Sequence, residues 1–163
     1  MPAMARSGTS GQPPEVRLDD VAKRIIEALQ VDGRRSYAAI ATEVGLSEAA
    51  VRQRVQRLIE ADIMQIVAVT DPLQMGFLRQ AMLGIRVSGD IDAVVDSLVA
   101  MTEVAYAVIT AGSFDILCEV VCEDDDHLLE VVTRRIRRLP DVASTETFVY
   151  LKLAKQHYDW GTR

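Results

Sequence analysis

Residues 33–58 read GRRSYAAIATEVGLSEAAVRQRVQRL, and this stretch predicts two short helices joined by a tight turn. Ser36 can cap the first helix, because its hydroxyl can accept a hydrogen bond from a backbone N–H that the first turn leaves unpaired. Gly45 suits the end of that helix, where a residue with positive φ is needed. Ser47 can cap the next helix in the same way. The pattern is typical of a helix-turn-helix, whose second helix enters the major groove of DNA.

The second predicted helix has an apolar side and a polar side. Val51, Val55 and Leu58 recur at helical spacing and are expected in the core. Arginine and glutamine side chains point away from them, and such side chains hydrogen-bond to base edges in the major groove. The residues predicted to contact DNA are Arg34, Ser36, Ser47, Glu48, Ala49, Ala50, Arg52, Gln53, Arg54, Gln56 and Arg57. The alternative is a helical hairpin whose polar side is only solvated.

The segments on either side complete a small domain over residues 17–62. Residues 18–33 predict the third helix that a helix-turn-helix needs to close its core. Residues 63–72, IMQIVAVTDP, are rich in β-branched side chains and predict a strand. That strand would make the domain a winged variant and would begin a linker over residues 63–79. Residues 1–16 are small, polar and proline-bearing, and they predict a disordered leader.

The charge of the chain is unevenly distributed. Its formal net charge is −6, which by itself disfavours binding to DNA phosphates. Residues 1–62 hold nine basic and nine acidic residues, whereas residues 63–163 hold nine basic and fifteen acidic ones. Within residues 33–58 five arginines oppose two glutamates. The candidate reading helix is therefore locally positive, and local positive potential is what attracts phosphate.

Length and composition indicate a globular protein of one or two domains. The chain has 163 residues, of which 49% are apolar, and no apolar run approaches the roughly 20 residues of a membrane span. Cys118 and Cys122 are interpreted as core thiols of a reduced, cytoplasmic protein. The acidic run 123–127 and the arginines within residues 134–138 are interpreted as complements of a helix dipole. No Ser/His/Asp or Cys/His arrangement is apparent, so the sequence predicts neither an enzyme nor a metal or cofactor site.

Residues 80–155 alternate between strand and helix patterns. Strands are predicted over residues 81–87, 104–111, 114–122 and 143–153, with helices over residues 91–98 and 124–139. This βαββαβ order predicts a ferredoxin-like α+β domain, followed by a tail over residues 156–163. Residues 104–109 are apolar on both faces, so both faces of the sheet must be covered. With helices on one face, a second subunit is the economical cover of the other, and we expect a homodimer.

Several motifs together resemble the Lrp/AsnC (feast/famine) family of bacterial and archaeal regulators, over about residues 18–155. In the first half these are LD…DGR, IA…VGLS and V..RV.RL, carried by Leu18, Asp19, Asp32, Gly33, Arg34, Ile40, Ala41, Val44, Gly45, Leu46, Ser47, Val51, Arg54, Val55, Arg57 and Leu58. In the second half they are AGSFD at residues 111–115 and LPDV with T.TF at residues 139–148. Ala39 and Ile59 depart from the family's usual glutamate, and Asp62 departs from its usual glycine.

This resemblance implies a fold and a function. The implied fold is an N-terminal winged helix-turn-helix domain and a C-terminal ferredoxin-like domain of the RAM type. Members are sequence-specific transcription regulators whose C-terminal domain binds amino acids and builds dimers that assemble further, often to octamers. For this chain it implies a palindromic double-stranded DNA operator, an amino-acid or related effector, a homodimer that assembles to a tetramer or octamer, no membrane partner, and a cytoplasmic, nucleoid-associated location.

The resemblance also implies an effector site near the AGSFD turn, at the interface between dimers. Gly112 and Ser113 can offer hydrogen-bond donors to a carboxylate, and Asp115 can face an α-ammonium group. Asp141 stands where many relatives have glycine, so it can reshape the pocket. The predicted effector residues are Gly112, Ser113, Phe114, Asp115, Asp141, Thr145 and Thr147. The alternative is a tight turn that binds no ligand.

Two other functions stay open. An architectural protein would compact DNA without a ligand and would need no effector site. Sirohaem decarboxylases share the implied two-domain arrangement and act on a tetrapyrrole. Such an enzyme would not need Arg52, Gln53 and Gln56 displayed on a reading helix, which disfavours it.

Overall fold

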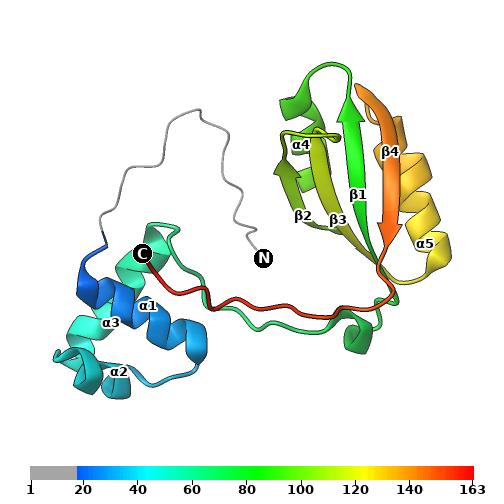
Figure 1. Ribbon diagram of the computed structural model, residues 1–163. Coiled ribbons are helices and arrows are strands. Elements are labelled where there is room, and N and C mark those ends of the chain that lie inside the picture. Colours follow the sequence, from blue (N-terminus) through cyan, green and yellow to red (C-terminus); the bar gives the residue numbers. More distant parts are fainter. Residues whose placement is uncertain (1–17) are drawn as a thin grey trace. The chain divides into compact units, whose positions relative to one another are not determined.

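A computed structural model describes residues 18–163, which form two compact units (Figure 1). The first unit contains the described residues up to Val69 together with Lys155–Arg163, and the second contains Thr70–Ala154. The leader predicted over residues 1–16 lies outside the described residues. None of the helices in the described part of the chain is long and apolar enough to cross a membrane.

The first unit is built on three helices, α1 (Asp20–Val31), α2 (Tyr37–Val44) and α3 (Glu48–Glu60). Ser36 caps α2 and Ser47 caps α3, each accepting a hydrogen bond of 3.2 Å from a backbone N–H. Gly45 ends α2 with φ 75°, the left-handed conformation that glycine adopts without strain. The helix-turn-helix predicted from these residues is confirmed.

Apolar residues from all three helices form the core of this unit. Ile25 of α1, Ile40 of α2 and Val51 of α3 are completely buried. Val55 and Leu58 are buried as well, as their helical spacing predicts. Removing this apolar surface from water stabilises the unit, and it leaves the polar side of α3 facing solvent.

The C-terminal end of α3 is closed by a residue in the left-handed region. Asp62 has φ 53°, and the N–H of the following Ile63 donates to the Leu58 carbonyl at 3.0 Å. A side chain is unfavourable in this region, although aspartate tolerates it better than most residues. Asp62 therefore adopts a turn conformation that glycine would adopt with less strain.

The predicted strand over residues 63–72 is wrong. Residues 64–71 belong to no strand, and the short helix η1 (Pro72–Met75) follows them. The β-branched side chains of Ile66, Val67 and Val69 are 44–62% exposed. Such residues favour a strand only where a neighbouring strand supplies hydrogen bonds and packing. The wing that this strand would form is therefore absent from residues 18–163.

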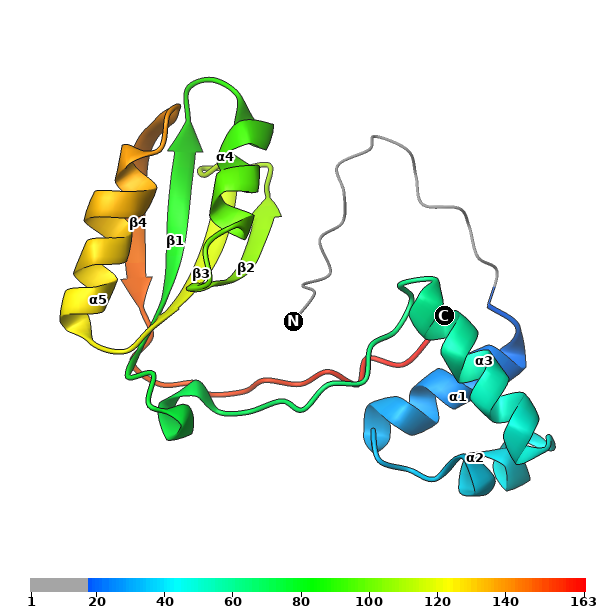
Figure 2. The ribbon, with the colours of Figure 1, turned by 180° about the vertical axis from the view of Figure 1, so that it is seen from behind.

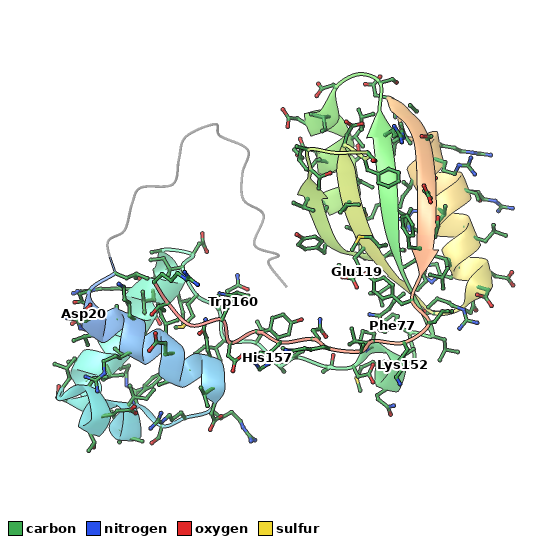
Figure 3. All side chains as sticks on the ribbon, in the orientation of Figure 1. Asp20, Phe77, Glu119, Lys152, His157 and Trp160 are labelled. Carbon is green, nitrogen blue, oxygen red and sulfur yellow. The ribbon has the colours of Figure 1, made fainter. Side chains whose placement is uncertain are left out.

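The last residues of the chain return to the first unit. The Gly161 N–H donates to Gln30 Oε1 at 3.2 Å, and the Thr162 hydroxyl donates to Glu27 Oε1 at 2.5 Å. Both acceptors lie on α1. Figure 3 labels Trp160 on this returning segment, and its side chain is 78% exposed. The first unit is thus assembled from two separate parts of the sequence.

The second unit confirms the predicted βαββαβ order. Its elements are β1 (Arg79–Val87), α4 (Ile91–Val99), β2 (Val104–Ile109), β3 (Ile116–Cys122), α5 (Asp125–Glu130) with its continuations η2 (Val131–Arg135) and η3 (Ile136–Arg138), and β4 (Val142–Val149). The strands form one antiparallel sheet in the order β2-β3-β1-β4. This is the strand order of a ferredoxin-like fold.

The two faces of this sheet differ. Helices α4 and α5 cover one face, as Figure 2 shows from behind, and bury side chains such as Leu83 and Ile116 completely. The opposite face, which we call the open face, carries Met82, Tyr106 and Phe148. Tyr106 is 51% exposed and Phe148 is 44% exposed. The described chain covers one side of its sheet only.

The helix predicted over residues 124–139 is continuous but not uniform. Its first part is α-helical, η2 is a π-helical turn, and η3 is a 3₁₀ turn. Val131, Val132 and Ile136 face the core across this irregular stretch. A π turn inserts a residue and shifts the residues that follow it around the helix, which an even 3.6-residue pattern does not predict.

Candidate nucleic-acid interface and effector site

The polar face of α3 lies open to solvent. Arg52, Gln53, Gln56 and Arg57 are all exposed, whereas the opposite face of the helix is buried. A shallow hollow runs along this face and is lined by Ala49, Ala50, Arg52, Gln53, Gln56, Arg57 and Glu60. The small alanines at the start of the helix leave room for close approach. This face therefore presents two guanidinium groups and two side-chain amides side by side, and all four can donate hydrogen bonds to a partner.

Arg52 is held in place by two neighbours. Its guanidinium donates to Glu48 Oε1 at 2.7 Å, a helical i,i+4 ion pair. The same group lies over the Tyr37 ring, with 5.1 Å between the guanidinium carbon and the ring centroid. Tyr37 was not among the residues predicted to contact DNA. Its position directly after the N-cap of α2 could have indicated that its ring lies near α3. Stacking on a ring restricts the guanidinium before any partner arrives.

Arg54 faces a different direction. Its guanidinium donates to Asp19 Oδ2 at 2.7 Å, and so ties α3 to the start of α1. The Ala22 N–H and the Arg54 guanidinium both hydrogen-bond to this carboxylate and lower the pKa of Asp19. Arg54 is half-buried, and the structure therefore places it between helices rather than on the exposed face.

The remaining predicted DNA contacts lie at the ends of the helices. Arg34 is exposed in the loop before α2, and its N–H donates to Asp32 Oδ1 at 2.9 Å. Ser36 and Ser47 already accept backbone hydrogen bonds as caps. Each serine can still donate its hydroxyl proton to a phosphate, because capping uses only the oxygen as acceptor. Within α3, Gln56 Nε2 donates a hydrogen bond to Glu60 Oε1 at 2.9 Å.

In the second unit, Asp115 and Asp141 both hold the turn that follows β1. The Val87 N–H donates to Asp115 Oδ2 at 2.8 Å, and the Asp90 N–H donates to Asp141 Oδ2 at 3.2 Å. Asp141 adopts a left-handed φ of 66°, and a Cβ added to Gly89 would collide with its carboxylate. The two carboxylates thus lie at the same end of the sheet, each with one oxygen already accepting a backbone N–H.

The AGSFD motif forms a tight turn between β2 and β3. The Thr110 N–H donates to the Asp115 carbonyl at 2.8 Å, and the Thr110 hydroxyl donates to the Phe114 carbonyl at 2.6 Å. Gly112 and Ser113 lie exposed at its tip. The turn is therefore rigid at its base and accessible at its tip.

The other predicted effector residues lie on opposite sides of the sheet. The Phe114 ring packs over Gly84 on the open face, where a Cβ at position 84 would lie 2.6 Å from the ring. Thr145 and Thr147 pair with Ile85 and Leu83, whose side chains point into the core on the helix side. The single chain brings the two carboxylates and the turn together, but not Phe114 with the threonines.

The open face gains a small aromatic cluster from this packing. Phe148 meets the Phe114 ring edge-on, with ring centroids 6.3 Å apart, and the Arg86 guanidinium lies 5.5 Å from the centroid of the same ring. The strand predicted over residues 114–122 begins two residues later, at Ile116, so Phe114 does not belong to it. Phe114 precedes β3, and a turn breaks the strict alternation that holds within a strand.

Among residues 18–163 no cluster of three histidine, cysteine or acidic side chains is arranged to hold a metal ion. Cys118 and Cys122 are free and buried, and burial raises the pKa of the Cys118 thiol to about 12. Such a thiol stays protonated and unreactive at neutral pH.

Comparison with known families matches both units. Residues 18–59 match the family model of the AsnC-type helix-turn-helix domain. Residues 77–163 match the model of a C-terminal dimeric α+β barrel domain of AsnC-type transcriptional regulators. The first match lies within the helical unit, and the second covers most of the sheet unit and continues through the C-terminal tail.

Individual proteins are similar along most of the chain. An uncharacterized HTH-type transcriptional regulator of Pyrococcus abyssi is 31% identical over 90% of this chain and 92% of its own length. The solved structure of Escherichia coli AsnC is 27% identical, with a TM-score of 0.74 over 86% of this chain and 96% of that one. The leucine response regulatory protein of Mycobacterium tuberculosis is 28% identical, with a TM-score of 0.77 over 86% of this chain and 99% of that one.

Proposed function

We propose that this chain, which belongs to the Lrp/AsnC family of helix-turn-helix transcriptional regulators, reads a specific DNA operator through the exposed face of α3. The observation that carries the proposal is the row of Arg52, Gln53, Gln56 and Arg57 on the one face of α3 that the core leaves open. Arginine pairs with guanine and glutamine with adenine in the major groove, so this row can discriminate base pairs.

The arginines of the unit divide into two roles in this proposal. Arg52 and Arg57 contact bases or phosphates, and Arg34 and the two capping serines contact the backbone at the ends of the helices. Arg54 positions α3 against α1 through Asp19. Glu48 releases Arg52 when a guanine edge takes its place, because an exposed ion pair contributes at most about 1 kcal/mol.

We expect the operator to be palindromic. The open face of the sheet exposes apolar side chains such as Tyr106 and Phe148, and the matching family model describes a dimeric domain, so the cover predicted from the sequence is a second copy of the chain. A two-fold dimer presents two reading helices to half-sites about 34–36 Å apart, one turn of DNA. Footprinting of a single, unpaired half-site would contradict this geometry.

Substitution of Arg52 tests the reading face. An operator is first selected from random duplexes, and Arg52→Ala is then titrated against it at fixed salt. We expect a loss of about 1–3 kcal/mol in binding free energy, with relaxed preference at one base pair. Lys152→Ala removes the same charge from the second unit and serves as the control. Equal affinities of the two variants would remove α3 from the interface.

The effector proposed for this chain is an amino acid or a related metabolite. It is supported by the exposed tip of the AGSFD turn, by the carboxylates of Asp115 and Asp141 at one end of the sheet, and by the name of the mycobacterial relative, which refers to a leucine response. Asp115 has one carboxylate oxygen beyond the one that Val87 engages, and that oxygen can face an α-ammonium group. The site would be completed by other subunits, since Phe114 and the threonines lie apart in one chain.

A thermal-shift screen of the twenty amino acids tests this effector class. A ligand that binds only the folded state stabilises it and raises the unfolding temperature, by an amount that grows with the ratio of free ligand concentration to Kd. Stabilisation by one amino acid or a small group supports the proposal. No shift with any of them would favour the architectural reading, in which the protein binds DNA without a ligand. We expect the protein in the cytoplasm on the nucleoid, with no cofactor.

A further inference from the structure

One surface of the second unit has no role in the DNA or effector site. The outward side of the helix formed by α5, η2 and η3 lies opposite the residues that pack into the core, Leu128, Val131, Val132 and Ile136. It carries, in order along the helix, Asp126, Leu129, Glu130, Arg134 and Arg137, which we call the α5 stripe. Figure 3 shows nitrogen-tipped side chains projecting from the end of this helix that leads to β4.

The α5 stripe is divided by charge. Asp126 and Glu130 form its acidic half, and Arg134 and Arg137 form its basic half; all four side chains are exposed. None of the four takes part in an ion pair within residues 18–163. The neighbouring Arg135, by contrast, is paired with Glu103 at 2.6 Å. The stripe therefore presents unpaired charges of both signs.

An apolar residue lies between the two halves. Leu129 is 60% exposed in the middle of the helix. A helix dipole favours acids in the first turn and bases in the last, which accounts for Asp126 and Arg137. It does not account for Glu130 in the middle of the helix, nor for an exposed leucine. An exposed leucine with charged residues around it is typical of a contact surface, in which a polar rim surrounds an apolar centre.

We propose that the α5 stripe is a contact between two copies of the chain, in which the helices pack antiparallel about a two-fold axis. In that arrangement Asp126 of one copy faces Arg137 of the other, and Glu130 faces Arg134. Both pairs have nearly the same midpoint along the helix, at the level of Val131 and Val132, so one axis serves both. The two Leu129 side chains then lie on either side of this axis, and each packs against the helix of the other copy.

DNA is a poorer partner for the same surface. Phosphates would meet the basic half, but Asp126 and Glu130 in the same stripe would repel them. A second copy satisfies both halves at once, because an isologous contact brings each patch onto its own complement. The stripe fits its own chain better than it fits a uniformly charged partner.

This contact is separate from the dimer of the proposed function. Helix α5 covers one face of the sheet, and the open face lies on the other, as both ribbon views show (Figures 1 and 2). A copy bound at each surface gives an assembly larger than a dimer. The proposal deepens the oligomerisation expected for this family by assigning a surface to it, and it does not depend on DNA or effector binding.

Charge reversal tests the contact, with sedimentation velocity as the measurement. One variant carries Asp126→Lys and Glu130→Lys, and the other carries Arg134→Glu and Arg137→Glu. Each alone makes the stripe uniformly charged, so like copies repel. Mixed together, the two variants are complementary. The control carries Asp92→Lys and Asp96→Lys, two exposed acids with the same spacing at the same turn of α4.

The expected results follow from the pairing. Near 0.1 M salt, where the Debye length is about 10 Å, wild type and the α4 control are larger than a dimer, and each charge-reversed variant is smaller than wild type. The mixture regains the larger size. At about 1 M salt the association constant of wild type falls by roughly tenfold or more, because exposed ion pairs are screened.

Two outcomes would overturn the proposal: charge-reversed variants that keep the wild-type size, or a mixture that assembles no further than its separate components. Failure of the open-face dimer is distinguishable from these. In that case the separate variants are monomers, and the mixture alone still decides whether the α5 stripe pairs. Circular dichroism of each variant, compared with the α4 control, verifies that the helix is retained.

Discussion

The helical unit and the sheet unit differ in how much of each a single chain completes. Three helices bury a closed core around Ile25, Ile40 and Val51, and they display a polar reading face that needs only DNA. The sheet unit closes one side of its sheet and leaves Tyr106 and Phe148 exposed on the other. Its candidate effector residues lie on both sides of the sheet. The helical unit therefore presents a complete DNA-binding surface, whereas the sheet unit leaves one of its two faces uncovered.

This difference also decides what could be predicted from sequence. The caps Ser36 and Ser47 and the turn at Gly45 are local signals, and each formed as its spacing predicted. The polar face of α3 followed directly from them. Helix periodicity contains enough information to place a side chain on a face, because the neighbours that decide it are three or four residues away.

Errors arose where the deciding neighbour is distant in sequence. The valines of residues 66–69 have strand propensity but no strand beside them. Phe114 turned to the open face because Gly84, thirty residues earlier, leaves a gap for its ring. The ion pair of Arg54 with Asp19, thirty-five residues earlier, was likewise not predicted. Periodicity carries no information about such partners.

Truncation of a core side chain in the sheet unit is the prediction with the largest expected effect, and it tests whether the two units unfold separately. Ile116 is completely buried, so Ile116→Ala loses both transfer free energy and packing, about 2–5 kcal/mol of unfolding free energy. Urea denaturation measures the loss of unfolding free energy. Amide hydrogen exchange should show reduced protection in β1 and β3, while the amides of α1–α3 stay protected. Leu117→Ala, half-buried on the open face, is the matched control with a smaller effect. A loss below about 1 kcal/mol at Ile116 would contradict the assigned face.

Removal of the Asp115 charge tests whether the proposed effector binding can be lost while DNA binding is kept. Asp115→Asn keeps an oxygen for the Val87 N–H but removes the charge offered to an α-ammonium group. We expect a loss of about 2–5 kcal/mol in affinity for the amino-acid effector, with operator affinity unchanged in its absence. Calorimetric titration with and without operator measures both, because coupling between the two ligands must be reciprocal.

Asp141→Asn provides the comparison for this variant. It removes the second carboxylate charge at the same end of the sheet and keeps the contact with the Asp90 N–H. An effect as large as that of Asp115→Asn would mean that the ammonium group is shared between the two. Wild-type affinity in Asp115→Asn would place the ammonium elsewhere.

Acid should weaken the sheet unit through one partly buried ion pair, between Glu103 and Arg135. Burial raises the pKa of the Glu103 carboxyl, but hydrogen bonds from Arg135 and from its own backbone N–H outweigh this and lower the pKa to about 2. Since the folded pKa lies below the ordinary 4.5, the stabilisation is present above about pH 4.5 and is lost as the pH falls towards 2. We expect roughly 1–3 kcal/mol from this group, and Glu103→Gln should flatten that part of the pH profile.

The smallest predicted effect concerns the end of α3. Asp62→Gly relieves a left-handed residue, but glycine also loses more entropy on folding, so the net gain is about 0.5 kcal/mol. Asp141→Gly relieves the same conformation and also removes the contact with the Asp90 N–H, and it should be neutral or destabilising. Thermal melts of both variants check the pair. A loss of stability in Asp62→Gly would show that its carboxylate has a partner.

The return of the C-terminal tail to α1 has a consequence for how the protein is made. Gly161 and Thr162 are the residues that contact Gln30 and Glu27, and they are synthesised some ninety residues after Val69. At about 5–20 residues per second, that is a delay on the order of ten seconds on the ribosome. The helical unit can form its core early, but it acquires its last two side-chain contacts only after the entire sheet unit has been translated. Completion of the DNA-binding unit thus follows synthesis of the sheet unit.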